Sequence, residues 1–281
     1  MRDAKVRASV EMAFGPSAFV LVCKPGSQLS VRLNIQRVAN KCYDSLLALV
    51  YPQACAVCGE SVEGRKFGVA CERCWEKTLL LNEQDTVCWK CGLPSVASVP
   101  AEIREGVRCR RCDDAAFTAA RACGFYEGAL KASVLALKRE PYVCKQLVEL
   151  MSAAQKQQPL NKATRVIPVP LHEKREKSRG FNQATLLAAG LSRSNSILLD
   201  QKSVIRISHT EQHRAGMDAR DRRKTVESAF RVTCPAVIKD EHILLIDDVF
   251  TTGATVSSCS QALLEAGAAD VFVLTLSRAS S

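Results

Sequence analysis

Apolar residues from residue 116 onward follow two patterns, short continuous runs and steps of three or four residues. A continuous run predicts a buried strand, and the stepped pattern predicts a helix with one buried face. We expect strands near 122–126 and over 165–171, 203–208, 227–232, 242–247 and 271–276, and helices after Gly128 and over 142–157, 180–193 and 255–267. Alternating strands and helices predict a doubly wound α/β domain with a mostly parallel sheet, which binds ligands at the carboxyl ends of its strands.

The first 115 residues are patterned more weakly. Residues 1–30 show no clear periodicity and are expected to be a disordered extension. Residues 31–52 are expected to form an amphipathic helix that ends at Pro52. Residues 53–115 have few periodic apolar positions, so this segment needs a staple to fold. The domain boundaries expected from these changes are 1–30, 31–52, 53–115 and 116–281. No segment reaches the ~18–20 apolar residues of a membrane span.

The cysteines indicate what stabilises this segment. Eight of the 14 form four Cys-x-x-Cys pairs: Cys55/Cys58, Cys71/Cys74, Cys88/Cys91 and Cys109/Cys112. Two such pairs supply a tetrahedral four-thiolate site, so the sequence predicts two structural zinc ions. We prefer a sequential arrangement, in which the first two Cys-x-x-Cys pairs bind one zinc ion and the last two bind the other. An interleaved arrangement remains open. Thiolate ligands require reduced cysteine, which favours a cytoplasmic location.

The charge balance adds a preference for anionic partners. The formal net charge is +10, which suits nucleic acid, phosphate esters or acidic surfaces, and also ordinary surface solubility. Residues 172–224 hold twelve Lys and Arg against six Asp and Glu, a net of +6. The scarcity of aromatic residues near this segment, only Phe181 and Phe230, weakens an interpretation as a single-strand DNA surface.

The segment "LLIDDVFTTGAT" places two carboxylates next to a loop that suits an anion. Its apolar strand ends at Asp247 and Asp248, and a loop into the next helix follows, made of Thr251, Thr252, Gly253, Ala254 and Thr255. Backbone amides at a helix N-terminus favour an anion such as phosphate. Carboxylates instead accept hydrogen bonds from hydroxyls or bind a divalent cation. A phosphorylated ribose satisfies both demands.

This segment resembles the phosphoribosyl pyrophosphate (PRPP) motif of the type I phosphoribosyltransferases. The stretches "VIPVPLHEKREKSRGFNQATLLAAGL", "GFYEGALKASVLALKRE" and "TEQHRAGMDARDRRKTVESAF" extend the resemblance over roughly 40–281, to the ComF family. Members of that family have a zinc-ribbon head and a phosphoribosyltransferase-like body, and some are linked to DNA uptake in competence. The resemblance implies a type I phosphoribosyltransferase fold preceded by a small cysteine-rich zinc-ribbon domain.

The resemblance also implies roles for residues. Asp247 and Asp248 would accept the ribose hydroxyls, and Thr251–Thr255 would hold the 5-phosphate. A pyrophosphate loop and lid, with Mg²⁺ bridging, would use Pro168, Val169, Pro170, Lys174, Arg175, Arg179 and Arg206, and the lid would extend past Gln212, Arg220, Arg222, Arg223 and Lys224. The acceptor pocket would lie near 122–130 and 278–281.

Two functions follow from the resemblance. The chain would bind PRPP and, if it is an enzyme, transfer the phosphoribosyl group to an unidentified acceptor, without glutamine amidotransferase activity. Alternatively, it would be a non-catalytic competence factor that binds single-stranded DNA or a helicase partner.

Overall fold

A computed structural model of the 281-residue chain describes residues 53–95, 99–207 and 229–279. The expected extension over 1–30 and the expected helix over 31–52 lie outside these residues. So do Gln212, Arg220, Arg222, Arg223 and Lys224 of the expected lid.

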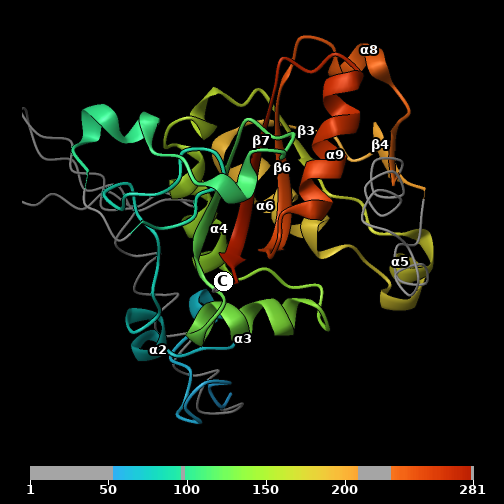
Figure 1. The fold of residues 1–281 in the computed structure, drawn as a ribbon. Coiled ribbons are helices and arrows are strands. Elements are labelled where there is room, and N and C mark those ends of the chain that lie inside the picture. The colour runs from blue at the N-terminus through green and yellow to red at the C-terminus, as the bar shows by residue number, and fades with distance from the viewer. Residues whose placement is uncertain (1–52, 96–98, 208–228, 280–281) are drawn as a thin grey trace, which may run out of the picture.

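The centre of the molecule is a five-stranded sheet in which every pairing is parallel. Its order is β1-β7-β6-β2-β3 (Figure 1). The strands are β1 (Ala119–Phe125), β2 (Arg165–Pro168), β3 (Leu198–Leu199), β6 (His242–Phe250) and β7 (Asp270–Arg278). The two longest strands, β6 and β7, lie side by side in the middle and are almost wholly buried, which explains their continuous apolar runs.

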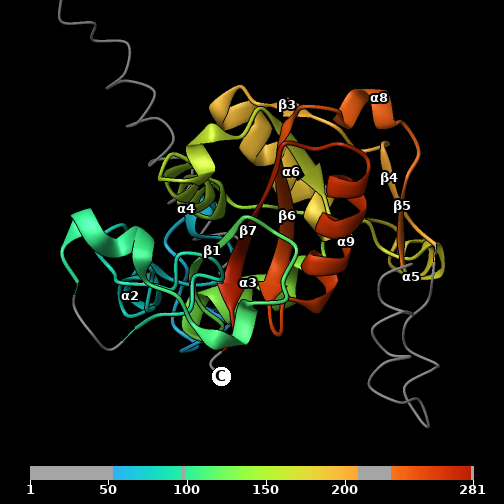
Figure 2. The ribbon, with the colours of Figure 1, turned by 45° about the horizontal axis from the view of Figure 1, so that its top comes forward.

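Helices cover both faces of the sheet (Figure 2). On one face lie α3 (Gly128–Leu137), α4 (Lys145–Gln155) and α6 (Gln183–Asn195), and on the other lies α9 (Ala254–Glu265). Successive residues of a strand point to opposite faces. Leu244 and Ile246 of β6 therefore join the core under α3, α4 and α6, whereas Ile243 and Leu245 join the core under α9.

Beside α9, an antiparallel pair stands apart from the main sheet. It consists of β4 (Val204–Arg206) and β5 (Phe230–Val232). Both strands are shorter than the apolar runs predicted for them. Four short elements were not predicted as such: α5 (Glu173–Arg179), α8 (Pro235–Ile238), the 3-10 turn η4 (Leu160–Lys162) and β3.

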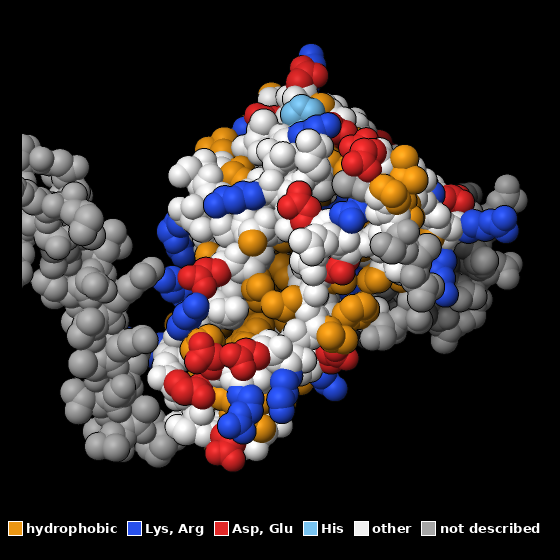
Figure 3. Space-filling model, turned by 90° about the vertical axis from the view of Figure 1, so that its left-hand side faces the viewer, with side chains coloured by type: hydrophobic (Ala, Val, Ile, Leu, Met, Phe, Trp, Pro, Cys, Tyr) orange, Lys and Arg blue, Asp and Glu red, His pale blue; other side chains and the backbone are white. Residues whose placement is uncertain are grey.

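The cysteine-rich segment forms two small units with little regular structure. It holds η1 (Arg65–Phe67), α2 (Glu72–Glu76), η2 (Ala101–Gly106) and η3 (Arg110–Cys112). Its chain joins the free edge of β1, where the Leu81 amide donates to Cys123 O at 2.9 Å and the Ala120 amide donates to Lys90 O at 2.6 Å. Figure 3, which faces the left-hand side of Figure 1, shows a hollow with a hydrophobic floor and charged side chains around it.

The predicted fold class is confirmed. A mostly parallel sheet with flanking helices follows a cysteine-rich zinc-ribbon region, and the carboxyl ends of β6 and β2 face the same edge as the segments that were expected to bind a ligand.

Candidate phosphoribosyl site and zinc clusters

The two adjacent carboxylates stand near the carboxyl end of β6, and they point to opposite faces of the sheet. Asp248 faces α3 and α6: its Oδ2 lies 3.1 Å from Lys138 Nζ and accepts a hydrogen bond from Gln183 Nε2 at 3.5 Å. Asp247 lies on the α9 face, close enough to interact electrostatically with Arg206 and Cys259. Its Oδ1 accepts a hydrogen bond from the Asp248 amide at 2.8 Å.

Burial changes the protonation of this pair. Burial of the Asp247 carboxyl group, and next the negative charge of Asp248, raise the pKa of Asp247 to about 7, although Lys138 opposes the shift. A buried carboxylate is stable when a donor or cation approaches it. Asp247 therefore suits a ligand that brings hydroxyl donors or a cation to the end of β6.

The loop between β6 and α9 has the geometry of an anion site. Gly253 has a φ of 78° and forms the N-cap of α9. A Cβ at this position would lie 2.7 Å from the Phe250 ring, so both the conformation and the space require glycine. Thr251, Thr252, Ala254 and Thr255 are exposed around it. Thr252 Oγ1 accepts a weak hydrogen bond from the Ala254 amide at 3.3 Å, and the helix N-terminus opens towards solvent.

The predicted pyrophosphate turn is anchored to the sheet. Pro168 ends β2, and the side chain of Asn182, the N-cap of α6, donates to Val169 O at 3.0 Å. Pro170 follows, and α5 then begins after His172. The turn is therefore held at the same edge of the sheet as the end of β6.

The structure brings some of the predicted basic residues to this edge and leaves others in solvent. Arg206 is half-buried, and burial followed by the charge of Arg175 lowers its pKa, while Asp247 opposes that shift. These three side chains therefore share one region. Arg179 Nη1 donates to Gln183 Oε1, which links it to Asp248 through one amide side chain. Lys174 is exposed on α5.

Sequence reasoning missed Lys138, Gln183 and Phe250 at this edge; Arg278 falls within the range 278–281 expected for the acceptor pocket, but its contacts were not predicted. Lys138, at the C-cap of α3, pairs with Asp248, and Gln183 bridges Asp248 to Arg179. Phe250 packs under the loop, and Arg278 stacks on the Phe250 ring with its Cζ 5.5 Å from the ring centroid. The β6–β7 register, which sets Phe250 opposite Arg278, would have identified the last contact had it been known.

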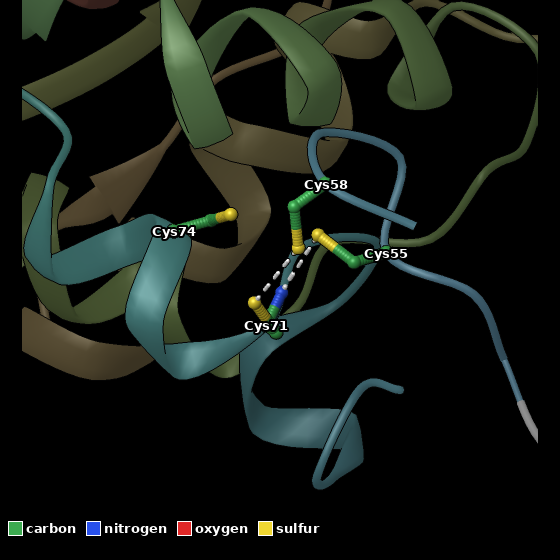
Figure 4. A group of neighbouring side chains, drawn as sticks. All are labelled: Cys55, Cys58, Cys71 and Cys74. Carbon is green, nitrogen blue, oxygen red and sulfur yellow. Dashed lines mark hydrogen bonds between the residues drawn. The ribbon is translucent and has the colours of Figure 1, made fainter. Parts of the chain in front are cut away.

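The eight paired cysteines form two clusters in sequential order. One contains Cys55, Cys58, Cys71 and Cys74, and the other contains Cys88, Cys91, Cys109 and Cys112; within each, all four sulfur atoms lie within 4.8 Å of one another. Figure 4 shows the first cluster, with the four side chains pointing inward. Sulfur–sulfur distances are 3.6 Å for Cys58 and Cys71 and 3.7 Å for Cys88 and Cys112. A disulfide needs about 2.05 Å, whereas the edge of a tetrahedral zinc–thiolate site is about 3.8 Å.

The surroundings of the clusters also match zinc ligation. Although burial opposes it, amide donors that include Cys71 N–H hold the pKa of Cys55 at about 6. Burial and then neighbouring cysteines raise the pKa of Cys74 and of Cys112. Four thiolates ionise together when a cation compensates their charge. Both clusters therefore fit a structural zinc site, as predicted, with every coordination position filled by cysteine.

Comparisons with known proteins agree with these two parts. Residues 46–113 match the family model described as "Double zinc ribbon domain". The DNA utilization protein YhgH of Escherichia coli O157:H7 is 42% identical over 115 residues, which cover 41% of this chain and 49% of the relative. Competence protein F of Haemophilus influenzae is 41% identical over 118 residues, and competence protein ComFC of Bacillus subtilis is 37% identical over 114. These matches cover 41% and 40% of this chain and 50% and 44% of the relatives.

Similar solved structures are phosphoribosyl enzymes. The glutamine PRPP amidotransferase from Bacillus subtilis, complexed with ADP and GMP, has a TM-score of 0.34 and 16% identity over 53% of this chain and 27% of its own. The phosphoribosylpyrophosphate synthetase from Mycobacterium smegmatis has a TM-score of 0.29 and 15% identity over 46% of this chain and 33% of its own. At such scores these matches add nothing to the sheet order described above.

The parallel sheet, the strand–loop–helix at its edge and the two clusters define an α/β protein with a double zinc ribbon. Its similarity to competence protein F and competence protein ComFC agrees with the predicted resemblance to the ComF family. It spans about half the length of the curated relatives it matches. Among the described residues, no helix has the length and apolar character needed to cross a membrane.

Proposed function

We propose that this protein binds PRPP together with Mg²⁺ and transfers its phosphoribosyl group to an acceptor. The observation that supports the proposal most strongly is the edge at the end of β6. There, the buried Asp248 and the half-buried Asp247 stand shortly before a loop whose threonines are exposed, at the N-terminus of a twelve-residue helix. The carboxylates match sugar hydroxyls, and the loop amides match a phosphate ester.

The neighbouring basic residues suit the leaving group. Arg206 on β4 interacts electrostatically with Asp247 and with Arg175 on α5, and the two arginines would neutralise pyrophosphate. In the transfer, the bond between the anomeric carbon and pyrophosphate breaks with its electron pair on pyrophosphate. The lone pair of the acceptor forms the new bond, and the acceptor loses a proton to solvent. Positioning and charge stabilisation are sufficient for such a step.

Asp247 and Asp248 point to opposite faces, so one ion cannot be held squarely between them. Mg²⁺ would instead enter with the pyrophosphate, whose charge it neutralises, and Asp247 is the carboxylate on the side of Arg175 and Arg206.

Titration calorimetry with PRPP, with and without Mg²⁺, tests the proposal. We expect metal-dependent binding that Asp247→Asn and Asp248→Asn each weaken at least tenfold. Asp270→Asn is the matched control, because Asp270 lies at the opposite edge of the same sheet. There its Oδ2 pairs with His242 Nδ1 at 2.8 Å. The proposal is wrong if PRPP fails to bind, or if all three variants behave alike. If PRPP binds as expected, measuring pyrophosphate release with a panel of bases and amines would identify the acceptor.

A second candidate is DNA binding, which the names of the relatives favour. The net charge of +10 is consistent with contacts to phosphates. In this function the chain would bind single-stranded DNA or a helicase partner in the cytoplasm without turnover. Binding of a labelled single strand at several salt concentrations separates the candidates. DNA binding predicts a steep salt dependence that Asp247→Asn and Asp248→Asn leave unchanged.

A further inference from the structure

A cavity of about 420 Å³ lies between the glycine loop and the second zinc ribbon. One wall is the loop Thr251–Ala254 with Ser257 of α9, and the opposite wall includes the zinc ligand Cys91. Phe117 and Phe250 line the cavity with their rings in an edge-to-face arrangement, 6.0 Å between centroids. The proposed sugar-phosphate loop thus opens onto a space that aromatic side chains line in part.

Arg278, the last residue of β7, also lines this cavity, and it is only 5% exposed. Its Nη1 donates to Cys91 O at 3.0 Å, and the guanidinium stacks on Phe250. Its Nε is buried and has no hydrogen-bond partner among the described residues. An unmade hydrogen bond of a buried charged group is destabilising, so an acceptor supplied by a ligand would stabilise this arrangement.

The shape and charge of the cavity restrict what can bind there. A guanidinium binds a carboxylate through two parallel hydrogen bonds, and the Phe rings favour a planar neighbour. Arg111 and Asp114 also line the cavity with opposite charges, so Arg278 leaves the lining with one net positive charge, which suits an anion of single charge. These features select a small planar molecule with a single negative charge.

We propose that this cavity binds the acceptor of the phosphoribosyl group, that the acceptor is a small planar molecule bearing a carboxylate, and that Arg278 binds this carboxylate. The role of this ligand as an acceptor rests on the proposed function. Its chemical class is inferred from the cavity alone. Because Cys91 O holds the guanidinium, the second ribbon is a positioning element for this binding.

The test uses the full-length, zinc-loaded protein without PRPP, so that it does not depend on the transfer reaction. Benzoate serves as the planar carboxylate and benzamide as its neutral counterpart. Binding is followed by calorimetry and by the ¹H–¹⁵N signal of Arg278 Nε. We expect benzoate to bind and to shift this signal, and benzamide to bind at least tenfold more weakly. Equal binding of the two probes, or no benzoate binding at millimolar concentration, would overturn the proposal.

Two variants separate recognition from folding. Arg278→Lys keeps the charge but loses the paired donors, so benzoate should bind at least tenfold more weakly while zinc content stays unchanged. Arg121→Lys is the matched control: Arg121 also donates to the second ribbon, at Trp89 O (2.8 Å), but it lines a different cavity. If both variants lose binding equally, general damage explains the loss and the assignment to Arg278 is wrong.

Inorganic phosphate distinguishes an acceptor site from a phosphate site. If phosphate displaces benzoate and shifts the Arg278 signal, the cavity belongs to the sugar phosphate and the acceptor assignment fails. Benzoate binding without PRPP binding would leave the ligand class standing and remove the proposed function. PRPP binding without benzoate binding would do the reverse.

Discussion

The two zinc ribbons have the same ligands but different relations to the candidate site. Cys55, Cys71 and Cys74 of the first ribbon belong to the core under α3, α4 and α6, which is the face of Asp248. The second ribbon belongs to the core under α9, which is the face of Asp247, and it also touches the cavity through Cys91.

The two ribbons differ in the number of contacts that connect each of them to the candidate site. The second ribbon lines the cavity directly through residues that include Cys91, and Cys91 O also accepts a hydrogen bond from Arg278. The first ribbon reaches the site in two steps: Thr78 Oγ1 accepts from the Ala129 amide at 3.0 Å near the start of α3, and Lys138 at the end of α3 pairs with Asp248. Identical metal chemistry can thus form a wall of a site or support a helix beside it.

The largest expected effect comes from removing one ligand from each ribbon in turn. Cys88→Ser should release one zinc equivalent and weaken carboxylate-probe and PRPP binding at least tenfold, because the second ribbon borders the loop. Cys58→Ser should also release one zinc equivalent while changing binding less than threefold, since Cys58 is exposed and does not line the cavity. Metal analysis and calorimetry measure both. Equal loss of binding in the two variants would remove the distinction.

The next effect concerns Asp247, the carboxylate on the face of the second ribbon. Its folded pKa of about 7 lies above the ordinary value of 3.8, so folding favours its protonated form. This residue therefore makes the protein less stable as pH rises from about 4 to about 7. Asp247→Asn should increase unfolding free energy at pH 8 by about 1–3 kcal/mol and make no difference near pH 4.

Urea unfolding at the two pH values checks this expectation. Asp270→Asn serves as the comparison, because Asp270 lies at the opposite edge of the sheet. A stabilised Asp247→Asn variant that no longer binds PRPP would indicate that this carboxylate is kept for function at the expense of stability. Destabilisation at pH 8 would contradict it.

A smaller effect is expected at Lys138, the link between the first ribbon's helix and Asp248. Lys138→Gln leaves a buried carboxylate without its cation and should cost about 2 kcal/mol. Lys145→Gln is the matched control, because Lys145 pairs with Glu149 at the surface of α4 and should cost less than about 0.5 kcal/mol. Thermal unfolding at neutral pH measures both. If the two variants are equally stable, Lys138 does not support Asp248.

The chain pattern was sufficient for the main architecture. The continuous apolar runs of β6 and β7 and the Cys-x-x-Cys spacing depend on local sequence, so both the parallel sheet and the two metal clusters were predicted correctly. Local pattern also placed the glycine loop at the start of α9.

The contacts that complete the site could not be predicted, because they join distant parts of the chain. Lys138 and Asp248 are 110 residues apart, and Arg278 and Cys91 are 187 apart. No periodicity encodes such a pairing; it depends on sheet order and on where the ribbons pack. Successive side chains of β6 point to opposite faces of the sheet. Asp247 and Asp248 therefore lie on different faces, although they are adjacent in the sequence. The expected roles of the site residues stay predictions until binding is measured.

The smallest expected effect is at Thr78, the first step of the indirect route. Its hydroxyl donates to Cys74 O at 2.7 Å and accepts from Ala129 N–H, so it connects the first zinc cluster to α3. Thr78→Val keeps the shape and removes both bonds, which should cost about 1 kcal/mol and lower Tm by about 2–4 °C.

The control is Thr86→Val in the second ribbon, where Thr86 Oγ1 accepts from the Val99 amide at 3.1 Å, a partner that lies outside α3. Both variants should lose similar stability, but Thr78→Val alone should weaken PRPP binding, by about two- to threefold, because α3 positions Lys138 and hence Asp248. If Thr86→Val weakens binding as much, the route through α3 is not specific, and the first ribbon acts on the site only by stabilising the whole fold.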